Sequence, residues 1–171
     1  IITSNNHSLD RGAKGALRTI KVLKERGLDP VGTYESEEDR EQILIKEAKG
    51  INIAFLSYTY GTNGIPIPTD KQYLVNLIDE ELILDDLAKA RQQADAVVVY
   101  LHFGEEYHRT PSKAQRKLAH LVLKNGANVI VASHPHVIQP GEWMEVEEPD
   151  GEVIKKYTAY SMGNFISAQR F

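Results

Sequence analysis

The chain of 171 residues contains no cysteine, so disulfide bonds and thiolate metal sites are excluded. Basic residues are not in excess, because the sequence has 20 lysines and arginines and 24 aspartates and glutamates, which gives a net charge of -4. We therefore expect no nucleic-acid partner, because such proteins carry a basic surface. No uninterrupted run of about 18 apolar residues occurs, so membrane attachment is expected only through a segment absent from this sequence.

The composition that remains is that of an ordinary globular domain. Hydrophobic residues make up 42% and charged residues 26% of the sequence. A chain of this length builds one domain with a substantial core. The sequence starts at Ile1 without a methionine and stops just after an expected strand, so we interpret it as part of a longer protein. We expect residues 1–171 to form a single, partial domain.

Hydrophobic periodicity and turn residues predict alternating strands and helices. Ser112 and Gln115 fit a capping box that opens the clearest helix. The order of the elements favours an α/β core with antiparallel additions. Helices are expected over 12–26, 80–94 and 111–127, and strands over 43–60 (two, joined at Lys49 and Gly50), 96–101, 128–133 and a hairpin over 143–161 that turns at 149–151.

Four of the six histidines fall just past expected strand ends: His7, His102, His134 and His136. In open α/β sheets, ligands bind beyond the carboxyl ends of the strands. If the strands are neighbours, these imidazoles converge on one edge of the sheet. The other two, His108 and His120, are expected in a loop and on a helix, without a role in a site.

The stretch "SHPH" at 133–136 is the sharpest local signal. Pro135 favours an extended backbone at His134, which would direct the imidazoles of His134 and His136 to the same side. Imidazole with amide and carboxylate oxygens suits Zn, Mn or Fe. A His-x-His turn by itself is more often a surface feature, so the prediction of a metal site depends on several such sites occurring together.

The polar residues near these histidines allow two interpretations each. Asn5 and Asn6 either hold polar groups for chemistry or build an Asx-turn, and Asp10 is expected to cap the helix that follows. Glu106 either orients an imidazole or is a solvated loop residue. Asn164 either lines the same edge of the sheet or is a turn residue beside Gly163.

Several motifs together resemble one known family. "SNNHSLDRG", "YLHFGEEY", "PSKAQRKLAHLVLKNGANVIVASHPHVIQP" and "YSMGNFI" occur in the order seen in the CapA family of poly-γ-glutamate capsule biosynthesis proteins. These proteins belong to the calcineurin-like metallophosphoesterase superfamily, and the resemblance is weakest over 34–80. It implies an α/β fold, a metallophosphoesterase-like αββα sandwich that lacks its N-terminal strands in this chain.

The resemblance also implies roles for individual residues. His7 would be the general acid, and the predicted contacts to substrate are Asn5, Glu106 and Asn164. The resemblance implies two divalent metal ions (Mn, Fe or Zn) in the complete domain. In the superfamily, two aspartate motifs precede the position of "NNH", and one of them contains the metal-bridging aspartate. Neither motif is found in this sequence, so we expect the two-metal site to be incomplete in this chain. Ser4, Asn5 and Ser133 stand where the wider superfamily has glycine. The implied metal ligands are Asn6, His102, His134 and His136.

The implied function is metal-dependent, phosphoesterase-type chemistry in the synthesis, export or anchoring of poly-γ-glutamate. The alternative is a non-catalytic binding or scaffold subunit of a capsule synthesis complex, and a third option is a phosphodiesterase unrelated to capsule. The expected partners are an anionic polymer or phosphate-ester substrate and other capsule synthesis subunits. The expected location is the bacterial cell surface or the outer side of the membrane, with an anchor outside this chain.

Overall fold

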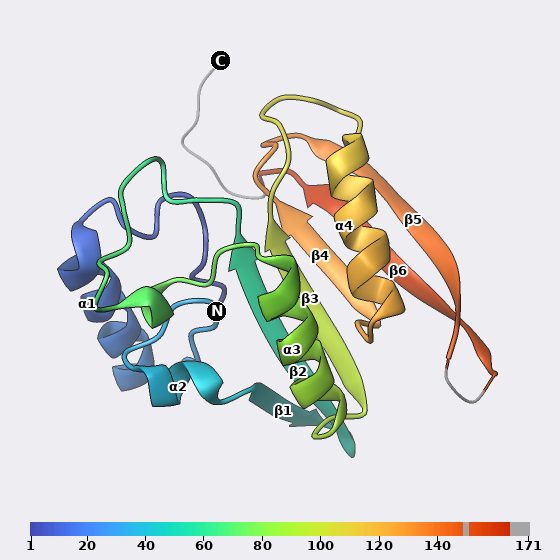
Figure 1. Cartoon of the computed structure of the whole chain (residues 1–171), viewed down its shortest axis with the longest axis horizontal. Helices are drawn as coiled ribbons and strands as arrows, with labels where there is room; N and C mark the ends of the chain where they lie inside the picture. Colours follow the sequence, from blue (N-terminus) through green and yellow to red (C-terminus); the bar gives the residue numbers. More distant parts are fainter. Residues whose placement is uncertain (149–150, 165–171) are drawn as a thin grey trace.

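The computed structural model describes residues 1–148 and 151–164, which form one six-stranded mixed sheet with helices packed around it (Figure 1). The strand order is β1-β2-β3-β4-β6-β5. The strands are β1 (Leu44–Ala48), β2 (Ile51–Thr59), β3 (Ala96–His102), β4 (Val129–Ser133), β5 (Ile138–Glu147) and β6 (Val153–Met162), and the helices are α1 (Gly12–Glu25), α2 (Glu37–Glu41), the short 3₁₀ helix η1 (Gln72–Leu74), α3 (Glu80–Arg91) and α4 (Lys113–Lys124).

The four central strands β2, β3, β4 and β6 run parallel, and the edge strands β1 and β5 are antiparallel to their neighbours. The carboxyl ends of the parallel strands therefore lie along one edge of the sheet. Residues that directly follow these strands are brought together there, although they are far apart in sequence.

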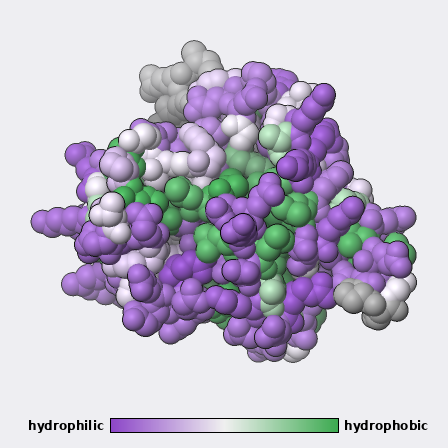
Figure 2. Space-filling view, in the orientation of Figure 1, coloured by the Kyte–Doolittle hydropathy of each residue, from purple (hydrophilic) through white to green (hydrophobic). Residues whose placement is uncertain are grey.

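Helices α3 and α4 cover one face of the sheet (Figure 1). In β3 buried and half-buried residues alternate, so that Val97, Val99 and Leu101 point into the core beneath these helices. The opposite face carries half-buried side chains such as Phe55 and Tyr100. Figure 2 shows apolar residues in a band across the middle of the molecule, surrounded by hydrophilic ones.

A second, smaller core lies beneath α1. Ala16 and Ile20 are buried on one face of this helix, at the spacing that its periodicity predicts. Leu9 is 1% exposed and packs in the same cluster as Leu74 and Val75, from the long connection between β2 and α3. This packing fixes the loop that contains Asn6 and His7 against the rest of the molecule.

Most of the predicted elements are confirmed, and the differences are local. The capping box of Ser112 and Gln115 is present. Asp10 does not cap α1; Arg11 is its N-cap residue, without a side-chain cap, because the Asp10 carboxylate contacts His7 instead. Helix α2 was not predicted from the sequence, because five residues carry too little periodicity. The β5–β6 hairpin is confirmed, but Pro149 and Asp150 of its predicted turn lie outside the described residues.

The predicted α/β class is correct. The described residues supply one sheet of the expected sandwich and the helices on one face of it. In this part of the chain, no helix is both long and apolar enough to cross a lipid bilayer.

Candidate metal centre

Side chains from four parallel strands meet at the carboxyl edge of the sheet. Tyr60 directly follows β2, His102 ends β3, His134 directly follows β4, and Asn164 lies two residues beyond β6. The imidazole centroids of His102 and His134 are 5.1 Å apart. The strand order therefore brings His102 and His134 together, as the sequence predicted.

The loop before α1 is tied to this edge by short polar contacts. The buried hydroxyls of Ser4 and Ser57, on β2, are 2.5 Å apart. The Asn5 side-chain oxygen accepts a hydrogen bond from the backbone N–H of His7 (2.8 Å), which is the Asx-turn considered as one interpretation of this residue. Asn5 thus shapes the loop that presents Asn6 and His7, while its predicted contact with substrate stays a prediction.

Asn6 is 6% exposed and both ends of its amide are engaged. Its Nδ2 donates to the side-chain oxygen of Asn63 (3.0 Å), so its Oδ1 faces Nε2 of His102 at 2.9 Å. The oxygen is the atom with which an amide ligates a divalent cation. Asn63 therefore fixes the amide of Asn6 in the orientation that a metal ligand needs.

His102 is held from its other side by the Tyr100 hydroxyl, 3.0 Å from Nδ1. Burial, together with the neighbouring imidazoles of His134, His136 and His7, lowers the pKa of His102 to about 4. Its ring is therefore neutral near pH 7, and neutral imidazole is the form that binds metals.

The two histidines of "SHPH" lie in an unusual backbone conformation. The expectation of an extended backbone at His134 is wrong, because φ is 116° at His134 and 60° at His136. Residues other than glycine rarely adopt positive φ, and such strain gathers at functional sites. The two rings still come close, with centroids 6.1 Å apart, through a tight turn rather than an extended strand.

Glu106 joins these two histidines. Glu106, His134 and His136 each offer a ligand atom within 4.8 Å of the others. Asn164 Oδ1 accepts from Nδ1 of His136 (3.0 Å), which leaves Nε2 of that ring on the side of Glu106, at 3.8 Å. An outer hydrogen bond of this kind orients a ligating imidazole.

The donors of this group fit a divalent metal ion. Nδ1 of His134 is buried and has no hydrogen-bond partner among the described residues, a costly state for a polar atom that a ligand would relieve. Burial also lowers the pKa of His134, which keeps its ring neutral. Imidazole and carboxylate donors suit Zn, Mn or Fe.

His7 lies at the outer side of the group with a side chain that is 64% exposed. Its Nδ1 contacts the carboxylate of Asp10 at 2.9 Å and lies 3.4 Å from Nδ2 of Asn63. A carboxylate at Nδ1 fixes the ring and leaves Nε2 as the nitrogen that can exchange a proton with a bound molecule. This arrangement is compatible with the general acid that the resemblance implies.

Some residues of the site were not recognised from the sequence. Tyr60 is 48% exposed, and its ring centroid lies 4.5 Å from that of His134. The sequence also did not reveal that Asn63 is the hydrogen-bond partner of Asn6, or that Asp10 is the partner of His7. Glu106 was expected to contact substrate, and its position offers a metal-ligand role as well. The one sequence signal for Tyr60 and Asn63 was "YGTNG", a Gly/Asn-rich loop directly after a strand.

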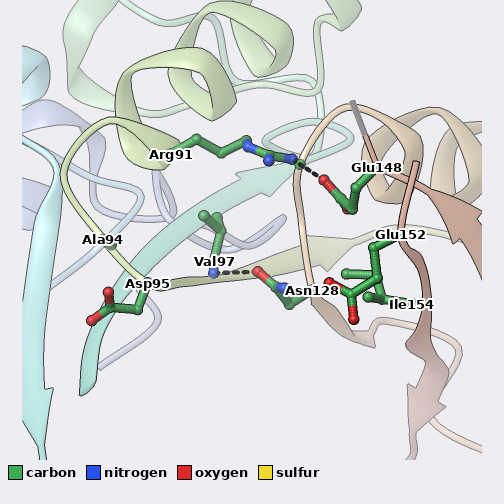
Figure 3. Close-up of a pocket in the computed structure, with 9 residues that line it drawn as sticks. Arg91, Ala94, Asp95, Val97, Asn128, Glu148, Glu152 and Ile154 are labelled. Carbon is green, nitrogen blue, oxygen red and sulfur yellow. Dashed lines mark hydrogen bonds and ion pairs between the residues drawn. The ribbon is translucent and has the colours of Figure 1, made fainter. Parts of the chain in front are cut away.

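His108 and His120 stand apart from the group, as expected. His108 pairs with Glu105 at 2.9 Å, and His120 is exposed on α4. A cavity of about 410 Å³ lies at the opposite, amino end of the sheet, beside Arg91 and Glu148 (Figure 3). None of the predicted site residues lines it.

The sequence matches a family model described as "Bacterial capsule synthesis protein PGA_cap" over residues 1–169. It is 36% identical to the capsule biosynthesis protein CapA of Bacillus anthracis over 97% of this chain and 39% of that protein. It is 34% identical to the PGA biosynthesis protein CapA of Bacillus subtilis over 98% of this chain and 42% of that protein. The chain thus spans about two fifths of the length of these relatives.

Solved structures with a similar fold include two nucleotidases. The NAD nucleotidase of Haemophilus influenzae aligns with 93% of this chain and 29% of its own, with a TM-score of 0.60 and 14% identity. A putative 5′-nucleotidase of Staphylococcus aureus aligns with 96% of this chain and 38% of its own, with a TM-score of 0.56 and 13% identity. At this level of identity the likeness establishes the fold, which is that of metallophosphoesterase-like domains.

Proposed function

Because the chain belongs to the family of bacterial capsule synthesis proteins, we propose that it serves poly-γ-glutamate capsule synthesis, export or anchoring through a metal-dependent phosphoesterase-type site. The observation that carries the proposal is the cluster of Glu106, His134 and His136, with ligand atoms within 4.8 Å of one another. The amide oxygen of Asn6 and Nε2 of His102 lie at the same edge of the sheet.

In this proposal Asn6, His102, His134, His136 and Glu106 hold Mn, Fe or Zn. Such an ion, when bound, supplies Lewis-acid polarisation of a phosphoryl or related oxygen. Other residues of the chain orient the ligands and enclose the site. Asn63 and Asn164 orient donors, and Tyr60 closes one side of the site by packing on His134.

His7 is the proposed proton donor. Asp10 holds Nδ1, so Nε2 carries the proton to the leaving group of a substrate bound over the metal ligands. The exposure of His7 suits this role, because substrate must reach it. Asn5 takes part by fixing the backbone at His7.

A second function, a non-catalytic binding subunit of a capsule synthesis complex, is favoured by one specific observation. Among the described residues the donor cluster contains a single carboxylate, Glu106. Two-metal phosphoesterase chemistry needs a group that bridges the metals, so a catalytic site requires a further carboxylate from outside this set.

The remaining proposals concern location and partners. The relatives are named as capsule biosynthesis proteins, so we place the function in the cell envelope, at the cell surface. The proposed ligand is an anionic polymer or a phosphate ester, and the proposed protein partners are other subunits of capsule synthesis.

Metal content and turnover, measured together, test the proposal. We would measure metal by plasma mass spectrometry and hydrolysis of a nitrophenyl phosphodiester, in this chain and in a form extended at its N-terminus. His134→Ala should lose the metal, whereas His7→Ala should keep it and lose turnover. His120→Ala, on the exposed side of α4, is the matched control and should change neither.

Two outcomes would count against this proposal. Equal metal loss in His7→Ala and His134→Ala would make His7 a ligand rather than an acid. Absence of metal from both forms of the wild-type protein would leave the non-catalytic function.

A further inference from the structure

A groove of about 350 Å³ runs along the first turns of α1 and opens directly beside His7. It lies outside the cluster of metal donors. Its lining is unusually rich in cations for a chain with a net charge of -4. The residues that line it are His7, Ser8, Asp10, Arg11, Lys14, Gly15, Arg18 and Thr19.

The three cations of this groove, Arg11, Lys14 and Arg18, form no ion pair with any residue in the described part of the chain. Further along the same helix the pattern changes: Lys21 lies 3.8 Å from Glu25, and Lys24 lies 2.7 Å from Glu35. The single carboxylate in the lining, Asp10, is engaged by His7. The groove therefore presents positive charge that the protein itself does not neutralise.

The spacing of these cations produces one continuous row. Residues three and four positions apart share a helix face, so Arg11, Lys14 and Arg18 line up on one side of α1. Seven residues of helix extend over about 10 Å, which is longer than a single phosphate or carboxylate group. Gly15 lies within the row, and a Cβ atom there would come within 2.4 Å of the Arg11 Cβ. The missing side chain keeps the floor of the groove open.

We propose that this groove binds successive carboxylates of a polyglutamate chain and leads the chain to His7. Guanidinium and ammonium groups pair with carboxylates through charge-assisted hydrogen bonds, and arginine does so in a two-pronged geometry. A polymer with one carboxylate per residue can engage all three cations at once, so their contributions combine. The identity of the polymer rests on the proposed function, whereas the groove and its charges do not.

Binding of purified poly-γ-glutamate of defined length tests the proposal. We would measure the dissociation constant by fluorescence anisotropy with EDTA present, so that metal binding does not contribute. Arg18→Glu and Lys14→Glu should each weaken binding at least about tenfold, the loss of one charge-assisted contact. Arg26→Glu is the matched control: it makes the same charge change at the other end of α1, outside the groove, and should stay within about twofold.

Inorganic phosphate, as a competitor, separates a polymer site from a site for one anion. If it displaces the polymer at an equal concentration of anionic groups, the groove binds single anions and the proposal is overturned. No binding by the wild-type protein, or equal weakening in Arg26→Glu, would overturn it as well. Circular dichroism shows whether the exposed substitutions preserve the fold.

The His134→Ala variant separates this inference from the proposed metal site. Its polymer binding in EDTA should equal that of the wild-type protein, because the groove uses no metal ligand. Metal loss without a change in polymer binding supports both proposals. If the protein never binds metal but the groove variants still weaken polymer binding, only the proposed metal-dependent function fails.

Discussion

At the scale of single residues, side-chain amides organise the site. Asn6 directs its side-chain oxygen at Nε2 of His102 because its side-chain nitrogen is held by Asn63. Asn63 adopts φ of 52°, a left-handed conformation that asparagine tolerates better than most residues. Asn164 orients the imidazole of His136 in a similar way, because its side-chain oxygen accepts a hydrogen bond from Nδ1 of that ring. The proposed metal ligands Asn6 and His136 are therefore held in place by neutral side chains, Asn63 and Asn164, that are not themselves proposed ligands.

Substitution of Asn63 tests this dependence. Asn63→Gly keeps the left-handed backbone but removes the acceptor for Asn6, so metal affinity should fall about 10- to 100-fold, as when other outer partners are removed. Asn63→Asp retains an oxygen at the same place and should keep affinity within a few-fold of wild type. Calorimetric titration with Mn²⁺ or Zn²⁺ would measure both. Equal affinity in Asn63→Gly and wild type would contradict the orienting role.

At the scale of elements, α1 differs from the other long helices in how it begins. Helices α3 and α4 start with Asp79 and Ser112, whose side chains accept a backbone N–H. Helix α1 starts at Arg11 without such a cap. Its stability therefore comes mainly from packing of its apolar face, on the smaller core that also fixes the loop of His7.

Replacement of Gly15 separates local propensity from packing. In an isolated helix, Gly→Ala stabilises by about 1 kcal/mol. Here the new Cβ would come within 2.4 Å of the Arg11 Cβ, which is attached directly to the backbone and cannot swing away. We expect Gly15→Ala to lower the free energy of unfolding by about 1 kcal/mol, within the cost of overpacking. Urea denaturation measures it.

Gly61→Ala is the matched control, since its added Cβ has no neighbour within 4 Å. The control should change stability by less than about 0.5 kcal/mol. A gain of stability in Gly15→Ala would show that α1 shifts freely and that the contact does not constrain it.

At the scale of the whole molecule, an ionic cluster joins elements that lie far apart in sequence. Lys156 on β6 is 1% exposed and donates both to the backbone oxygen of Leu123 in α4 and to Glu148, at 2.7 Å. Arg91, at the end of α3, reaches the other oxygen of Glu148 at 2.9 Å (Figure 3). Glu148 thus joins the end of α3 to Lys156 on β6, and Lys156 in turn joins this ionic cluster to α4.

The cluster predicts a pH dependence of stability. The hydrogen bond from Lys156, and then the one from Arg91, lowers the pKa of Glu148 below its ordinary value of 4.5. The carboxylate is ionised in the folded state at a lower pH than in the unfolded chain, so its stabilisation is fully present above pH 4.5. It is lost as the pH falls through the lower, folded-state pKa.

Glu148→Gln should therefore cost about 3 kcal/mol at pH 7, because it leaves the buried Lys156 cation without its partner. The difference from wild type should begin to shrink below pH 4.5 and should vanish only below the lower, folded-state pKa of Glu148, where the carboxyl is neutral in the folded and the unfolded state. Lys156→Met in the same background should recover much of the loss, since an apolar residue needs no counter-charge. Chemical denaturation at several pH values would measure these effects. A difference that is independent of pH would contradict the ionic origin.

Local patterns of the sequence determined the three long helices, the strands and the places where histidines follow strands. Periodicity, the Ser112 cap and the Lys49–Gly50 turn act over a few residues, so they can be read without the fold. The family motifs likewise pointed to Asn6, His7, His134 and His136.

Tertiary structure alone decided which of these groups meet. The contact between Asn6 and His102 joins residues 96 positions apart, and that between Asn6 and Asn63 joins residues 57 apart. The parallel order of β2, β3, β4 and β6 brings their carboxyl ends to one edge, and the turn that contains His134 and His136, both with positive φ, lies beside Glu106. Contacts of this range depend on strand order and turn geometry, which no short stretch of sequence encodes.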